Sequence, residues 1–175
     1  EIKYKLPFVF SNKDFFIEGI SNTKKNILLI PGASHISKRY PVIKFAEFAN
    51  LFDANFIVIW GNDEEKKYAN KIKELSPKIN ICEKLSIDAL IRIVGKVDLI
   101  IGSDTGPTHL AWAQNIPSIT LFGPTPGYRN CYITDINKII ESNSKVNPNK
   151  INKNDYSIRD ISVNEILELT KNILT

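Results

Sequence analysis

Several residue types are scarce in this chain. None of its 175 residues is methionine, not even the first, which indicates a fragment, a processed product or a chain without its native start. Its two cysteines, Cys82 and Cys131, form no Cys-x-x-Cys motif. We therefore predict reduced thiols and a cytoplasmic protein rather than a disulfide framework. The two histidines stand alone in the sequence, so neither a metal site nor a cofactor is expected.

Long hydrophobic runs are also lacking. No apolar stretch approaches the length needed to cross a bilayer, and residues 1–5 lead into only a short apolar patch, which argues against a signal peptide. The excess of positive charge is small, because the chain has 23 Lys and Arg against 19 Asp and Glu, for a net charge of +4. The basic residues are dispersed, as on a solvated surface. Their excess favours an anionic ligand or a membrane surface, and nucleic acid is not an expected partner.

What the chain does have is an alternation of strand and helix patterns. Strands are expected at 26–30, 55–60, 79–82, 98–101 and 118–122, and helices at 41–52, 63–75, 86–95 and 107–114. This spacing predicts an α/β, Rossmann-like, doubly wound parallel sheet over residues 26–140. Residues 1–25 are interpreted as an edge or interdomain segment, 141–160 as a long loop, and 161–175 as an amphipathic helix.

The segment 102–113 reads Gly-Ser-Asp-Thr-Gly-Pro-Thr-His-Leu-Ala-Trp-Ala and joins an expected strand to an expected helix. This geometry presents free backbone N–H groups to an anion. Asp104 or Thr105 can cap the helix, Gly106 lets a ligand approach the backbone, and His109 lies one turn in. An ordinary βα turn with a structural histidine has the same local chemistry, so both interpretations stay open at this point.

The loop after the first strand, 30–41, is the second informative segment. It offers a small hydroxyl, Ser34 or Ser37, followed by Lys38 and then by an aromatic residue and proline. A lysine and a hydroxyl can cradle a phosphate, although the Gly-Lys-Ser/Thr ending of a Walker loop is absent. The alternative is a surface lysine beside a helix start. Arg39 is expected to face solvent.

These two segments, together with Ile-Pro-Ser-Ile-Thr-Leu-Phe-Gly-Pro-Thr at 116–125, resemble the donor-binding half of the lipopolysaccharide heptosyltransferases. The resemblance runs in order from about Ile27 to about Phe122. It implies the C-terminal domain of a two-domain, inverting, metal-independent GT-B glycosyltransferase that uses ADP-heptose. Asp-Thr-Gly at 104–106 favours the type that adds the first heptose to Kdo, heptosyltransferase I.

The resemblance also implies roles for individual residues. Ser34 and Lys38 would bind the phosphates, with Ser37 as the alternative hydroxyl, and Lys38 would stabilise the leaving group. Glu65, four residues after Gly61, would accept hydrogen bonds from the ribose hydroxyls, with Glu64 as the alternative. Both glutamates are also simply favourable at a helix N-terminus.

On the other side of the expected site, Leu85 would contact the adenine, although a core leucine has the same pattern. Asp104 would position the heptose hydroxyls, while the backbone near Thr105 and Gly106 would face the phosphates. His109 would contact the pyrophosphate or the sugar. The residues after Gly123, namely Thr125, Tyr128 and Arg129, could close over the sugar, but their spacing is not specific.

The expected partners are ADP or ADP-heptose on this chain and the Kdo-lipid A acceptor on a domain outside it. The family's general base belongs to that domain, so this chain alone is expected to be inactive. A peripheral contact with the cytoplasmic face of the inner membrane is compatible with this interpretation. The resemblance further implies that the C-terminal helix packs toward the other domain. Its apolar residues are then expected to lack a partner in this chain and to expose apolar surface: Val163, Ile166, Leu167 and Leu169. Two alternatives stay open: a GT-B transferase for a different nucleotide sugar, and a solitary, non-catalytic nucleotide-binding module.

Overall fold

The structure, a computed structural model, describes residues 19–175, so most of the segment 1–25 lies outside the described residues. Six strands form one sheet in the order β3-β2-β1-β4-β5-β6, and every neighbouring pair is parallel. The strands are β1 (Asn26–Ile30), β2 (Asn55–Val58), β3 (Ile79–Ile81), β4 (Leu99–Ser103), β5 (Ser118–Phe122) and β6 (Asn137–Glu141). The predicted parallel, doubly wound α/β sheet is confirmed.

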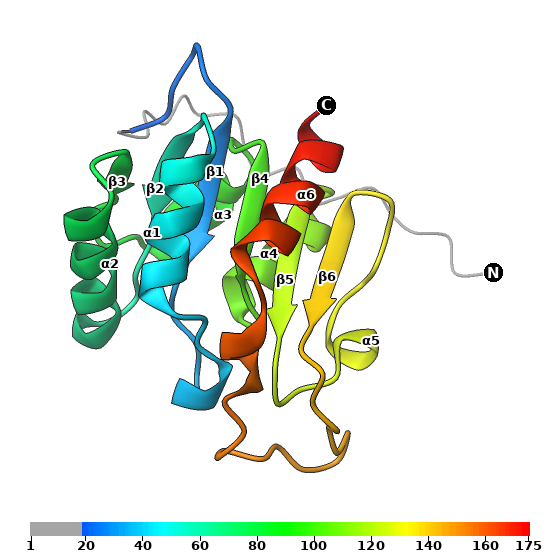
Figure 1. The fold of residues 1–175 in the computed structure, drawn as a ribbon. Coiled ribbons are helices and arrows are strands. Elements are labelled where there is room, and N and C mark those ends of the chain that lie inside the picture. The colour runs from blue at the N-terminus through cyan, green and yellow to red at the C-terminus, as the bar shows by residue number, and fades with distance from the viewer. Residues whose placement is uncertain (1–18) are drawn as a thin grey trace.

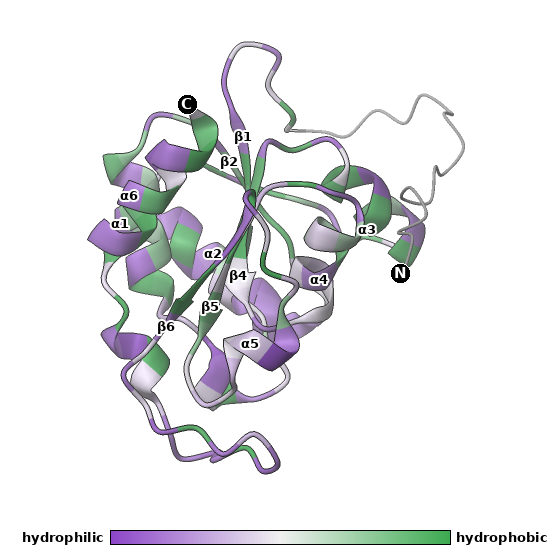
Figure 2. Cartoon of the chain, turned by 90° about the vertical axis from the view of Figure 1, so that its right-hand side faces the viewer, coloured by the Kyte–Doolittle hydropathy of each residue, from purple (hydrophilic) through white to green (hydrophobic). Residues whose placement is uncertain are grey.

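Helices cover both faces of the sheet, as Figures 1 and 2 show. On one face lie α1 (Val42–Leu51), α2 (Asp63–Leu75) and α6 (Val163–Leu174), and on the other lie α3 (Ile87–Val94) and α4 (Gly106–Ala113). The short helix α5 (Gly127–Asn130) and the 3-10 turns η1 (Ile36–Lys38) and η2 (Ser157–Asp160) lie in loops. Within residues 19–175, no helix combines the length and the apolar character that a membrane span requires.

The buried strands divide their side chains between two cores. In β1, Ile27 and Leu29 face the core under α1, α2 and α6, whereas Leu28 and Ile30 face the core under α3 and α4. Successive side chains on a strand point to opposite faces. Because both faces are covered, β1 is an unbroken apolar run with all five residues buried.

Helix starts follow capping chemistry visible in the sequence. The Asn62 side chain accepts a hydrogen bond from the Glu65 N–H, and Ser86 accepts one from Ala89. The predicted helix at 63–75 has those bounds in the structure, and the one at 86–95 is confirmed with Ser86 as its N-cap. Thr105 is the N-cap of α4, with Pro107 in the first turn.

Strand β4 extends two residues further than predicted. The expected strand ended at 101, but Gly102 pairs with Ile30 and Ser103 pairs with Leu121. A side chain at Gly102 would place its Cβ 2.8 Å from the Ile30 Cβ. Glycine at position 102 therefore allows close packing against β1 rather than a turn. The turn toward α4 begins at Asp104.

The segment after β5 differs most from expectation. Strand β6 and helix α5 were not predicted, and β6 completes the sheet beside β5. The apolar face of α6 has its partners within this chain. Val163 and Ile166 are buried in the core that α6 shares with α1 and α2, and Leu167 and Leu169 pack against that core. The expectation that this face lacks a partner in the chain is therefore wrong, and residues 163–174 belong to the same core as α1.

Candidate functional site

A cavity of about 530 Å³ lies at the carboxyl ends of β1, β2 and β4. The strand order reverses between β1 and β4, and such a switch point is where open α/β sheets bind ligands. The cavity brings together eight of the nine residues predicted for the site: Ser34, Lys38, Glu65, Leu85, Asp104, Thr105, Gly106 and His109. The ninth, Ser37, is fully buried and does not line it.

An ion pair joins the two loops that the sequence singled out. Lys38, on the loop after β1, places its Nζ 2.8 Å from Oδ2 of Asp104, which directly follows β4. The two side chains are only 11% and 7% exposed. An ammonium carries three N–H donors, so Lys38 can hold Asp104 and still present donors to the cavity that it lines.

Asp104 is a buried carboxylate with four donors around it. Nε2 of His109 lies 3.0 Å from Oδ1. Oδ2 is approached not only by Lys38 but also by the Thr125 hydroxyl at 3.2 Å and the Asn130 amide nitrogen at 3.0 Å. Burial raises the pKa of Asp104, but the hydrogen bonds from His109 and Lys38 outweigh it and hold the pKa well below its usual range. Asp104 is therefore a fixed negative charge and a poor proton acceptor.

The N-terminus of α4 forms the floor of the site between these loops. The Thr105 N–H donates to the Thr108 hydroxyl at 3.1 Å, which fixes the entry into the helix. The N–H of Gly106, in the first turn, has no partner inside the helix. A Cβ built on Gly106 would meet nothing within 4 Å, so the space beside its Cα is open, and Gly106 lines the cavity. The Thr105 hydroxyl is buried and has no hydrogen-bond partner in the part of the chain that the structure describes.

Glu65 occupies the opposite wall, in the first turn of α2. Its Oε2 accepts a hydrogen bond from the Gly61 N–H at 2.7 Å, and the residue lines the cavity. A side chain on Gly32 would place its Cβ 2.4 Å from the Glu65 carboxyl carbon. Glycine at position 32 is therefore what lets this carboxylate approach the loop after β1.

Glu64, the alternative to Glu65, has a different position. It is exposed, does not line the cavity and pairs with Arg39 at 2.7 Å. Arg39 also donates to the Ala33 carbonyl and to the Tyr68 hydroxyl, and its side chain is only 14% exposed. The expectation that Arg39 faces solvent is wrong, because the guanidinium ties the loop after β1 to α2.

Leu85 follows β3, which lies three strands away from β4 and Asp104 in the sheet order. It lines the cavity together with Ile59, Trp60, Ile87 and Leu90. The Trp60 indole N–H donates to the Cys82 carbonyl at 2.8 Å, which holds the ends of β2 and β3 together. This end of the cavity is thus apolar and suited to a flat ring, whereas the end near Lys38 and Gly106 suits an anion.

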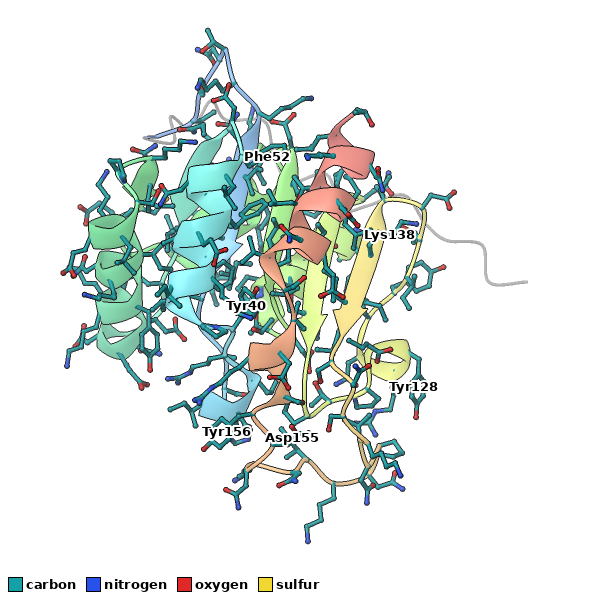
Figure 3. The ribbon with its side chains drawn as sticks, in the orientation of Figure 1. Tyr40, Phe52, Tyr128, Lys138, Asp155 and Tyr156 are labelled. Atoms are coloured by element: carbon teal, nitrogen blue, oxygen red, sulfur yellow. The ribbon has the colours of Figure 1, made fainter. Side chains whose placement is uncertain are left out.

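A second hollow, of about 650 Å³, adjoins the first and shares Asp104 and His109 with it. Its other walls come from α4 and from α5 and its flanks: Trp112, Tyr128, Arg129, Asn130, Cys131 and Tyr132. Tyr128 is 68% exposed and points outward from α5 at the carboxyl end of the sheet (Figure 3). The sequence had singled out Tyr128 and Arg129 without specific spacing; it did not point to Asn130, whose role depends on where α5 places it.

Among residues 19–175, no group of three or more His, Cys, Asp or Glu side chains is arranged to hold a metal ion. The charged groups of the site are instead the Lys38–Asp104 pair and the Glu65 carboxylate.

Several heptosyltransferases are similar in sequence to this chain. Lipopolysaccharide heptosyltransferase 1 of Campylobacter coli is 42% identical over 88% of this chain and 48% of its own length. A lipopolysaccharide core heptosyltransferase of Haemophilus influenzae is 28% identical over 70% of this chain and 37% of its own. The chain therefore spans about half the length, or less, of these curated relatives.

Solved structures show the same fold. E. coli heptosyltransferase WaaC with ADP superposes with a TM-score of 0.73 at 17% identity, over 89% of this chain and 46% of that one. A family 9 glycosyl transferase from Veillonella parvula gives 0.76 at 20% identity, over 89% of this chain and 47% of that one. The family model for glycosyltransferase family 9 (heptosyltransferase) matches residues 5–157. The order of site residues around the sheet switch point and these matches agree, and the chain belongs to glycosyltransferase family 9.

Proposed function

We propose that this chain is the donor-binding half of an inverting heptosyltransferase that uses ADP-heptose and acts in lipopolysaccharide biosynthesis. The observation that carries the proposal is the order of cavity-lining groups along the edge of the sheet: apolar Leu85 follows β3, the Glu65 carboxylate follows β2, Lys38 follows β1, and the helix N-terminus at Gly106 follows β4. A base, a ribose and a diphosphate occur in that order in a nucleotide sugar. The same donor class is supported by a relative that is a lipopolysaccharide heptosyltransferase and by solved structures of E. coli WaaC with ADP and with ADP-2-deoxy-2-fluoro heptose.

In this proposal the adenine lies against Leu85 and the apolar end of the cavity, and the ribose hydroxyls donate to Glu65. The diphosphate lies between Lys38, the Ser34 hydroxyl and the Gly106 N–H. Ser34 is preferred to Ser37 because Ser34 lines the cavity while Ser37 is buried. The sugar then begins near Asp104 and His109, where the second hollow opens.

The proposed reaction is an in-line displacement at the anomeric carbon. The acceptor oxygen forms a bond to that carbon, while the bond from the carbon to the diphosphate oxygen breaks and its electron pair leaves with ADP. Negative charge therefore grows on the diphosphate, where the fixed ammonium of Lys38 stabilises it more in the transition state than in the ground state. The low pKa of Asp104 makes it unsuitable as the base, and we assign no general base to this chain.

Asp104 has two proposed tasks. It holds Lys38 and His109 in place through both carboxylate oxygens. Among residues 19–175, Oδ1 accepts from one donor, His109, so it retains acceptor capacity for one sugar hydroxyl. The heptose would extend from there toward Trp112 and Tyr128, whose rings suit the apolar face of a sugar.

For the acceptor we propose Kdo of the lipopolysaccharide inner core and an enzyme of type I. The relative with 42% identity carries the name of type 1. A lipid-linked acceptor places the whole enzyme at the cytoplasmic face of the inner membrane, in peripheral contact with it.

A transfer assay with the full-length protein tests this proposal. Incubation with ADP-heptose and a Kdo-terminated lipid A should add one heptosyl unit to the acceptor, as detected by mass spectrometry. An acceptor that already carries the first heptose is the control, and it should not react. Transfer only from a uridine or guanosine diphosphate sugar would contradict the donor, and reaction only with the heptosylated acceptor would contradict type I. Residues 1–175 alone should give no transfer.

A further inference from the structure

We propose that Asn130 is a positioning residue: by donating a hydrogen bond to Asp104, it fixes the carboxylate that holds Lys38 at the diphosphate end of the nucleotide cavity. This inference rests on the proposed function, because it assumes that Lys38 meets a phosphate. Asn130 is the last residue of α5, far in sequence from the loop that carries Lys38.

The geometry places three elements on one oxygen atom. Oδ2 of Asp104 accepts from Nδ2 of Asn130 at 3.0 Å, from the Thr125 hydroxyl at 3.2 Å and from Nζ of Lys38 at 2.8 Å. The loop after β1, the end of β4 and the β5–α5 region thus meet at a single buried atom.

The orientation of the Asn130 amide is determined by its two neighbours. Its nitrogen faces the Asp104 carboxylate, and its oxygen accepts from Nε of Arg129 at 3.2 Å. Rotating the amide by half a turn would set oxygen against carboxylate and nitrogen against guanidinium, so only this orientation satisfies both contacts. Asn130 therefore offers Asp104 a donor of fixed direction.

A fixed carboxylate matters because lysine has a long and flexible side chain. Holding one lysine side chain in a single arrangement costs conformational entropy. In this structure that arrangement is set before any ligand arrives, because the carboxylate plane is held at Oδ1 by His109 and at Oδ2 by Asn130 and Thr125. Preorganisation of this kind strengthens ligand binding without any new contact to the ligand.

A double-mutant cycle on the chain tests the inference through ADP binding, measured by calorimetry. Asn130→Ala should weaken ADP binding by about five- to tenfold. In a Lys38→Met background the same change should cost less than about twofold, because the lysine through which Asn130 acts is gone. An equal loss in both backgrounds, or no loss in either, would overturn the proposal.

Two further comparisons distinguish the proposed effect on ADP binding from a simple folding defect. Thr125→Val removes only the hydroxyl donor to Asp104 at nearly constant shape and should weaken ADP binding, whereas Thr125→Ser should restore the binding. Asn70→Ala, at an exposed position on α2, is the matched control and should leave binding unchanged. If Asn130→Ala does not fold, equal binding by the two Thr125 variants overturns the inference. If the unaltered chain does not bind ADP, the proposed function fails first and the inference falls with it.

Discussion

At the scale of single residues, the site depends on one buried ion pair. Removing Lys38 and Asp104 from water is costly, and a buried pair is stable only when further hydrogen bonds satisfy it. Asp104 has those bonds from His109, Thr125 and Asn130. The result is a cation with a defined position next to an open helix N-terminus, which is the arrangement that a departing diphosphate requires.

Lys38 should therefore be essential for turnover in the full-length enzyme. Lys38→Ala should lower kcat/KM by a factor that corresponds to about 2–4 kcal/mol of lost transition-state stabilisation, since one preorganised electrostatic contact to the leaving group is lost. Lys38→Arg should retain only part of the wild-type kcat/KM, because a planar guanidinium does not replace a point charge. Steady-state kinetics checks this, with thermal melting to separate a folding defect.

The matched control is Lys171→Ala, an exposed position on α6. Arg39 is unsuitable as a control, because it braces the loop through Glu64 and Tyr68. A Lys38→Ala enzyme close to wild type would show that the lysine does not face the leaving group.

Asp104 should make the stability of the chain depend on acidity. Its pKa is lower in the folded protein than in the unfolded chain, so its ionised form stabilises the fold above about pH 4, and this contribution is lost as the pH falls further. Asp104→Asn should unfold more easily than wild type at about pH 7, by about 3 kcal/mol. Urea unfolding should show that the gap narrows toward about pH 3, and a constant gap would contradict this assignment of the carboxylate.

At the scale of elements, the loop that carries Lys38 is held from two sides. Arg39 connects it to α2 through Glu64. The Tyr40 hydroxyl donates to the Ile161 carbonyl at 3.0 Å, just before α6, and Nζ of Lys44 donates to the same carbonyl at 2.8 Å. Figure 3 shows Tyr40 between α1 and the chain that leads into α6. Helix α6 is therefore part of the support of the site.

Loss of the α6 core contact should destabilise the whole chain. Ile166 is 1% exposed in the core shared with α1, so Ile166→Ala should lower the free energy of unfolding by about 3 kcal/mol. Ile43→Ala, at a residue 61% exposed on α1, should change it by less than about 0.5 kcal/mol. Chemical denaturation measures both, and similar values for the two variants would show that α6 is not anchored in this core.

The elements that the sequence predicted well are those with strong local signals. Apolar runs between polar turns marked β1 and β5, and the cap Ser86 marked α3. Strand β6 escaped prediction because it has only two consecutive isoleucines, Ile139 and Ile140, in a polar flank. The partner of α6 was misjudged because an amphipathic pattern shows that a helix has an apolar face, not which surface covers it.

At the scale of the whole molecule, the parallel topology of the sheet brings the site residues together. Residues from four separate loops meet because the carboxyl ends of β1, β2, β3 and β4 lie along one edge of the sheet (Figure 1). The loop after β5 and helix α5 close the same edge and add the second hollow. In the proposed function, a nucleotide sugar runs along this edge from Leu85 to Tyr128, with its reacting carbon near the shared residues Asp104 and His109.

Which residues line the nucleotide cavity was largely predictable from sequence, because motif positions after parallel strands converge by topology alone. Interactions among those residues were not. The choice between Ser34 and Ser37 depends on the 3-10 turn η1, which buries Ser37. The contact between Asn130 and Asp104 spans 26 positions in the chain and depends on the short helix α5, for which no local pattern was available.

Nucleotide selectivity of residues 1–175 tests the central claim most directly. Isothermal calorimetry should show saturable binding of ADP, at least about tenfold tighter than that of UDP or GDP, because in the proposed function the apolar wall at Leu85 contacts the adenine ring. A chelator should leave the affinity unchanged, since Lys38 and the α4 N-terminus supply the positive field. Preference for a uridine nucleotide, or no binding of ADP at all, would contradict the account.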